Sequence, residues 1–229
     1  MCRFKSGIIL KDRVFIPEYD HHTNMLEELK IEDTYDNAKR LFVRAELIPK
    51  NNDVFSPVEE WEFVVDQDIL PEWFVAEYEK QRMIAAVKEW AKTHIHIGKD
   101  NLVISEGQSH YIKDCQNVNV CDSATVEYIC GSATVEYICG SATVKNIYDS
   151  ATVKNIYDSA TVKNIYGSAT VEKSGGNAVI ITSPYIKWRG QEKLLLLENS
   201  TLKDNYGHVI YQSGDFKLVS VSNESVEEG

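Results

Sequence analysis

The sequence has no long hydrophobic run and no secretory signal. Among its 229 residues, no apolar run approaches the length that crosses a bilayer. The opening residues, MCRFKSGIIL, have neither the long apolar stretch nor the small-residue cleavage site of an exported protein. We therefore expect a cytoplasmic protein with no membrane contact.

Clustered basic residues are also absent. The formal net charge is −11, and it is spread along the chain: residues 1–98 hold 19 acidic and 13 basic residues, and residues 122–172 hold 6 and 3. Binding to phosphate backbones needs clustered lysine and arginine, so direct nucleic-acid binding is unlikely. A solvated acidic surface is the simplest interpretation, and an acidic decoy of nucleic acid is an alternative.

Cysteine is scarce and odd in number. A chain without an export signal is expected to keep its thiols reduced, so five cysteines predict free thiols rather than a disulfide framework. The five are Cys2, Cys115, Cys121, Cys130 and Cys139.

The most informative feature that is present is a nine-residue repeat. Each unit begins with Asp or Gly and continues Ser-Ala-Thr-Val, and six units follow one another without a gap over residues 122–172, which end within the sixth. The period is too short for a helical-hairpin repeat, and the unit has too many β-branched residues for a helix. The array is therefore predicted to be strands. Its units start at Asp122, Gly131, Gly140, Asp149, Asp158 and Gly167.

The order of residues inside the unit predicts a β-solenoid. The first position, Gly or Asp, suits a tight turn. Strand alternation then directs Ala, Val and the later Ile inward and Thr outward. Nine residues cannot enclose a core, whereas two units, about 18 residues, form a flattened coil that stacks on its neighbours at about 4.8 Å. Six units would make three coils.

The array is expected to continue into irregular ends. We expect one solenoid over residues 99–222, covered at both ends by degraded or strand-rich segments, with a frayed tail at residues 223–229. The segment Asn199–Gly207 has the pattern of a worn repeat.

The first 98 residues predict a separate α+β head domain. A hairpin at the start, a short helix capped by Thr23 and two alternating strands precede a long helix with Pro71 in its first turn. The boundary with the solenoid is expected near Gly98. The fold class is thus an α+β domain followed by an all-β solenoid.

The outward positions of the array are the candidate interaction surface. A part that can change length by whole units suits a spacer or assembly face better than a catalytic pocket. Calcium is rejected, because three of the six units lack an aspartate. Cys121 and Cys139 should stack one coil apart, as structural filler. The candidate surface residues are Thr125, Thr134, Thr143, Thr152, Thr161, Thr170, Tyr148, Tyr157 and Tyr166.

Catalytic chemistry, if present, would lie in the head. Removal of Met1 would expose Cys2 as a thiol beside a free amine, a nucleophile and a base in one residue. His21 and His22 could supply a base or a metal ligand, as could His94 and His96, yet neither pair has further ligands at a suitable spacing. Asp66, Asp68 and Glu72 are explained as caps of the long helix. No metal and no cofactor are expected.

Two resemblances accompany these patterns. The start MCRF resembles families with an amino-terminal cysteine nucleophile, namely amidohydrolases and proteins that crosslink abasic DNA sites, although their downstream motifs are missing. The string VDQDILPEW together with the SATV nonapeptides resembles accessory proteins of gut bacteria and their phages. The second resemblance implies the architecture and a phage setting, and it implies no activity.

The leading hypothesis is a non-catalytic interaction or assembly protein whose solenoid binds or stacks on a protein partner or on another copy. A phage-encoded accessory or counter-defence factor would be a protein of this kind. One alternative is an enzyme or abasic-site crosslinker that uses Cys2. The other alternative is a sponge for a ligand or a decoy for nucleic acid.

Overall fold

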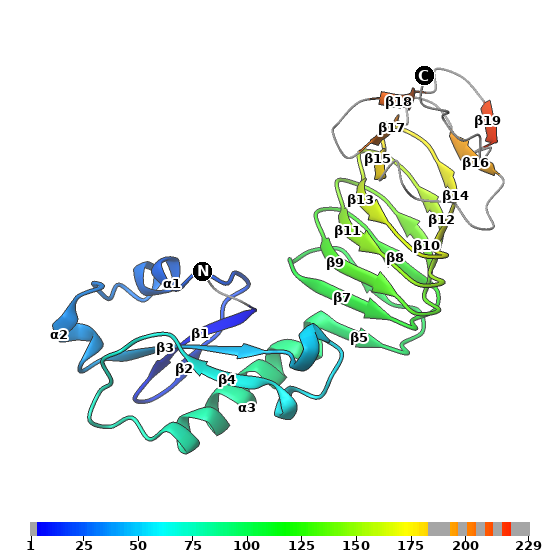
Figure 1. Ribbon diagram of the computed structural model, residues 1–229. Helices are drawn as coiled ribbons and strands as arrows, with labels where there is room; N and C mark the ends of the chain where they lie inside the picture. The colour runs from blue at the N-terminus through cyan, green and yellow to red at the C-terminus, as the bar shows by residue number, and fades with distance from the viewer. Residues whose placement is uncertain (1–3, 183–192, 197–200, 205–208, 213–216, 221–229) are drawn as a thin grey trace, which may run out of the picture. The chain divides into compact units, whose positions relative to one another are not determined.

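A computed structural model describes residues 4–182, 193–196, 201–204, 209–212 and 217–220 (Figure 1). The chain divides into two compact units, residues 1–95 and 96–229, here named the head and the solenoid. The division falls between Ile95 and His96, a few residues before Gly98, where the sequence suggested a boundary. Within the described residues, no helix is long and apolar enough to cross a membrane.

The head is built on a four-stranded antiparallel sheet with the strand order β2-β1-β3-β4. The predicted hairpin, the two later strands and the long helix are all present. The strands are β1 (Lys5–Leu10), β2 (Val14–Phe15), β3 (Phe42–Ile48) and β4 (Glu62–Val65). The helices are α1 (His22–Glu28), α2 (Tyr35–Ala38) and α3 (Ala76–His94), with 3-10 turns η1 (Lys50–Asn52) and η2 (Val58–Glu60).

The two faces of this sheet pack against different helices. On one face, side chains of β1 and β3 form a buried apolar cluster with α1 and α2; its members are Ile8, Leu10, Met25, Leu26, Ala38 and Phe42. On the other face, α3 approaches Gly7 so closely that a Cβ there would lie 3.0 Å from Met83 Cε. Strand alternation therefore places Ser6, which pairs with Glu46, on the face that α1 covers.

Two predicted helix starts in the head are wrong. Helix α1 begins at His22 with His21 as its N-cap, so Thr23 lies inside the helix. Helix α3 begins at Ala76, and Pro71 instead starts a separate turn in which the Phe74 amide donates to the Pro71 carbonyl. The neighbouring Trp73 indole donates to the Arg40 carbonyl at 2.8 Å. Contacts across the head thus fix these starts, where local capping preferences do not.

The solenoid consists of two sheets whose strands alternate along the chain, and Figure 1 shows the successive coils. The seven-stranded sheet has the order β19-β16-β14-β12-β10-β8-β6, and the eight-stranded sheet has the order β18-β17-β15-β13-β11-β9-β7-β5. The strands before and within the array are β5 (Ile95–Ile97), β6 (Val103–Ile104), β7 (His110–Lys113), β8 (Val118–Val120), β9 (Thr125–Cys130), β10 (Thr134–Ile138), β11 (Thr143–Ile147), β12 (Thr152–Ile156), β13 (Thr161–Ile165) and β14 (Thr170–Ser174).

The pairing register confirms the predicted coil of 18 residues. In the seven-stranded sheet Thr134 pairs with Thr152, and in the eight-stranded sheet Thr143 pairs with Thr161, always in parallel. Each unit therefore stacks on the unit two places earlier. The array supplies one strand of each sheet per coil, as two back-to-back nonapeptides require.

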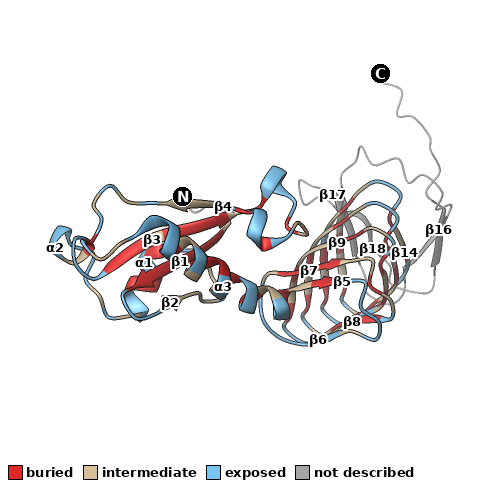
Figure 2. Cartoon of the chain, turned by 90° about the horizontal axis from the view of Figure 1, so that it is seen from below, coloured by how far each residue is buried: buried red, intermediate tan, exposed pale blue. Residues whose placement is uncertain are grey.

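The interior of the solenoid is the apolar column that the repeat predicted. The Ala, Val and Ile positions of the array are buried, and Figure 2 shows buried segments that recur from coil to coil along the strands. Because each strand buries the same side chains as its neighbour, the coils stack without change of register. The prediction of a β-solenoid is confirmed.

The turns of the array alternate between Gly and Asp along the stacking direction. All six first positions have positive φ. One column of turns reads Asp122, Gly140, Asp158, and the Gly140 amide donates to Asp158 Oδ2 at 2.9 Å. In the other column the Gly131 amide donates to Asp149 Oδ2 at 3.0 Å. Asp149 and Asp158 therefore each accept a hydrogen bond from the turn amide of the coil before.

Beyond the array the parallel stacking continues and then reverses. The strands are β15 (Val179–Thr182), β16 (Lys193–Leu196), β17 (Thr201–Asp204), β18 (Val209–Gln212) and β19 (Lys217–Ser220). β17 pairs in parallel with β15, and antiparallel strands β18 and β19 then end the two sheets. The worn repeat at 199–207 contains β17, but its remaining residues, like the tail at 223–229, lie outside the described residues.

Candidate functional site

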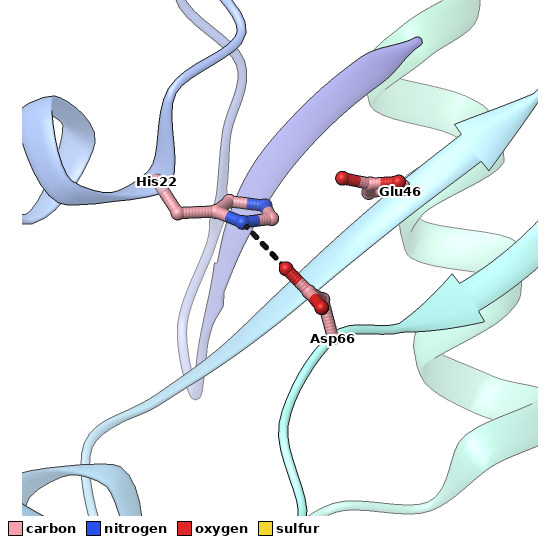
Figure 3. Close-up of side chains that lie close together, drawn as sticks. All are labelled: His22, Glu46 and Asp66. Atoms are coloured by element: carbon pink, nitrogen blue, oxygen red, sulfur yellow. Dashed lines mark ion pairs between the residues drawn. The ribbon is translucent and has the colours of Figure 1, made fainter. Parts of the chain in front are cut away.

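The head brings together three side chains that can ligate a metal ion: His22, Glu46 and Asp66 (Figure 3). His22 is the first residue of α1, Glu46 lies on β3, and Asp66 directly follows β4. One potential ligand atom from each residue lies within 4.8 Å of the other two. His22 and Glu46 are buried, whereas the Asp66 side chain is about half exposed.

Backbone pairing positions the two carboxylates on one face of the sheet. Glu46 pairs with Val64 of β4, so Asp66, two residues further on, faces the same way. The Asp66 amide also donates to the Arg44 carbonyl, which extends the strand contact by one residue. Ser6 lies beside Glu46, with 3.5 Å between Ser6 Oγ and Glu46 Oε1.

The contacts of His22 define how its ring nitrogens are used. Nε2 lies 3.3 Å from the Ala45 carbonyl oxygen, and Nδ1 lies 3.3 Å from Asp66 Oδ2. A carbonyl oxygen only accepts hydrogen bonds, so Nε2 carries the proton and donates. Nδ1 is therefore directed at a carboxylate and at the space between the three side chains.

The sequence named His22 and Asp66 but did not connect them. Asp66 was explained as a cap of the long helix, and this is wrong because α3 starts at Ala76. Glu46 was overlooked, because one acidic residue on an alternating strand resembles a solvent-facing residue. The three are separated by at least 20 positions in the chain, so no local spacing could have revealed the cluster.

The other sequence-selected residues of the head have separate positions. His94 ends α3 and its Nε2 lies 2.8 Å from Glu18 Oε2. His96 belongs to the solenoid, where its ring stacks on His110 with 5.6 Å between ring centroids. The two histidines therefore form no common site. Cys2 lies outside the described residues.

The six threonines of the candidate surface form two ladders on different sheets. Each threonine lies directly beside its counterpart in the next coil, and Thr170 Oγ1 is 3.2 Å from Thr152 Oγ1. The first ladder, on the eight-stranded sheet, contains Thr125, Thr143 and Thr161. The second ladder, on the seven-stranded sheet, contains Thr134, Thr152 and Thr170.

Beside each threonine ladder runs a row of charged residues. Lys145 Nζ lies 2.6 Å from Glu127 Oε1 beside the first ladder, and Lys154 Nζ lies 2.7 Å from Glu136 Oε1 beside the second. The third members of the rows are Lys163 and Glu172, respectively, and both are exposed. Neither forms an ion pair with the described part of the chain. Within the array, each charged row thus ends on an exposed charge, positive beside the first ladder and negative beside the second.

The three tyrosines are likewise divided between two columns. Tyr148 and Tyr166 stack with 4.9 Å between ring centroids, and further ring contacts lead from Tyr148 to Tyr128 and from Tyr128 to Tyr111. Burial and the neighbouring tyrosines raise the pKa of Tyr148. Tyr157 belongs to the opposite column, which also contains Cys121 and Cys139 by the 18-residue register.

Cys121 and Cys139 stack one coil apart, with 2.7 Å between their Sγ atoms. Both are free thiols and partly buried. Burial, followed by the hydrogen bond to Cys121, raises the pKa of Cys139 to about 12. The Cys139 thiol therefore stays protonated at neutral pH and is a poor nucleophile.

Comparisons with protein-family models, with curated proteins and with solved structures find no match. The functional argument therefore depends on the geometry of the molecule alone.

Proposed function

We propose that this protein is a non-catalytic interaction or assembly protein, whose solenoid stacks on a protein partner through its two threonine ladders. The observation that supports this most directly is the register: neighbouring coils present identical outward side chains at the spacing of β-strands, about 4.8 Å. Such a surface matches a partner of the same periodicity.

A second copy of this chain is the partner that fits best. A second copy has the same distance between its coils, because it has the same sequence and fold. Within the array, the charged row beside the first ladder ends on Lys163 and the row beside the second ladder ends on Glu172, so the first ladder's face of one copy complements the second ladder's face of another. Such a contact joins different surfaces and can extend into a chain of copies. In the phage setting that the sequence resemblance suggests, the assembly would form in the infected cell.

The test measures the oligomeric state of the full-length chain by sedimentation, at increasing protein concentration and at increasing salt. We expect association that weakens with salt, because exposed charges are screened. Lys163→Glu should weaken it and the swap Lys163→Glu with Glu172→Lys should restore it. Lys39→Glu, in the exposed loop after α2, is the matched control. A monomer at every concentration, or no effect of Lys163→Glu, would overturn the proposal.

A further inference from the structure

We infer that His22, Glu46 and Asp66 bind one divalent transition-metal cation in the head. The inference is independent of the proposed assembly, because it concerns a different unit of the chain. Its basis is the convergence of three ligand atoms within 4.8 Å of one another from three separate elements (Figure 3). A further set of this kind, with three or more such residues, does not occur in the parts that the structure describes.

The first argument is the direction of the His22 ring. Since Nε2 donates to the Ala45 carbonyl, Nδ1 presents a lone pair when the imidazole is neutral. That lone pair faces Asp66 Oδ2 at 3.3 Å, a distance at which a shared cation, either a proton or a metal ion, joins the two atoms. A metal ion at Nδ1 is such a cation, and the hydrogen bond from Nε2 orients the ring as in many metal-bound histidines.

The second argument is electrostatic. With a neutral His22, the two carboxylates give the cluster a charge of −2, which a divalent cation neutralises. Glu46 is only 3% exposed, and coordination of a metal ion is one way in which a protein offsets the cost of burying such a charge. Asp66 is about half exposed and leaves one side of the cluster open to solvent. A cation can therefore enter there and keep a water molecule as an additional ligand.

The third argument concerns size and ligand type. Tetrahedral ligands of Zn²⁺ at about 2.0–2.2 Å lie about 3.3–3.6 Å from each other. The 3.3 Å between His22 Nδ1 and Asp66 Oδ2 already fits, and the other separations, which lie within 4.8 Å, need to close by at most about 1.5 Å. An imidazole nitrogen favours zinc or a similar transition metal over magnesium or calcium, which prefer oxygen alone.

The experiment is a titration of the metal-free, untagged full-length chain with Zn²⁺ by calorimetry, and with Mg²⁺ for comparison. The chain carries Cys121→Ser and Cys139→Ser, so that this thiol pair does not compete for zinc. We expect one saturable zinc site, preferred over magnesium, and a rise in the thermal midpoint of the head.

Asp66→Asn is the decisive variant, because this half-exposed side chain can lose its charge without a gap in the core. It should weaken zinc binding at least about tenfold, as should His22→Gln. The matched controls His21→Ala and Asp68→Asn change exposed neighbours and should leave affinity unchanged. Absence of saturable zinc binding, or full affinity in a folded Asp66→Asn chain, would overturn the inference.

Discussion

At the scale of single residues, the turns of the solenoid show why Gly and Asp occupy the same position of the repeat. Both tolerate positive φ, and the stacking register uses their difference. A Gly has no Cβ that would clash with the turn of the preceding coil. The Asp at the same position of the next coil accepts a hydrogen bond from the amide of that Gly. The sequence predicted the turn, whereas the alternation along each column became visible only when units 18 residues apart were paired.

Gly140 should be less tolerant of a side chain than Gly167. A Cβ at Gly140 would lie 2.7 Å from the Asp122 amide nitrogen, whereas the shortest contact at Gly167 would be 3.3 Å. Both substitutions to alanine incur the cost of positive φ, about 1 kcal/mol, and only Gly140→Ala adds a backbone clash. We expect a loss of about 2–4 kcal/mol for Gly140→Ala and about 1 kcal/mol for Gly167→Ala, measured by denaturant unfolding. Equal losses would contradict this account of the turns.

Cys139 should make the stability of the solenoid depend on alkaline pH. Its folded pKa is raised above the usual thiol value, to about 12, by burial and by the hydrogen bond to Cys121. The folded chain then holds a proton that the unfolded chain releases above about pH 9, so stability falls as pH rises from there toward 12. Denaturant midpoints across this range should fall less in Cys139→Ser. The same slope in both chains would refute the prediction.

At the scale of elements, the strands of the array could be predicted and the helix starts of the head could not. A strand such as β11 (Thr143–Ile147) follows from its own alternation, because the same residues are buried in every coil. Helices α1 and α3 instead begin where contacts across the head hold them: His22 contacts the Ala45 carbonyl, and Trp73 binds the Arg40 carbonyl. Local capping rules contain no information about such partners.

Within β11, inward and outward positions should differ sharply in their effect on stability. Ile147 is fully buried in the column, so Ile147→Ala leaves a cavity and should cost about 2–5 kcal/mol. Thr143→Ala on the outer ladder removes a half-buried side chain and should cost less than about 1 kcal/mol. Denaturant midpoints compare the two. A large loss in Thr143→Ala would show that the ladder stabilises the coils, in addition to any role in binding.

At the scale of the whole molecule, the alternation of Gly and Asp sets the length by which the solenoid can change without penalty. The pattern along the chain returns after four units, or 36 residues, because the two columns of turns are out of phase. Removal of two units keeps the strand register but stacks an Asp turn on an Asp turn and a Gly turn on a Gly turn. Copying by four units therefore preserves every turn contact.

Two deletions test this. Deletion of residues 122–157 leaves Asp158 and Gly167 where Asp122 and Gly131 were, so the turn pattern is kept. Deletion of residues 140–157 puts Asp158 directly on Asp122 and Glu172 on Glu136, and like charges at this distance repel. If each coil interacts only with its neighbours, the loss of one coil should lower the free energy of unfolding by half as much as the loss of two coils.

We expect the 18-residue deletion to cost more than half of the stability that the 36-residue deletion costs, by thermal and denaturant unfolding of the solenoid. Both chains should keep a folded head, since it is a separate compact unit. Losses in proportion to length would show that the turns contribute no pairing preference.

The sequence by itself determined the solenoid, because its repeat carries the same local choice six times and each copy agrees with the coil it builds. Turn residues, strand alternation and the 18-residue coil all follow from nine positions. The tertiary structure divides the threonines into two ladders, as a coil of two units requires. It alone assembled His22, Glu46 and Asp66, because long-range strand pairing brings together residues whose separation along the chain shows no pattern.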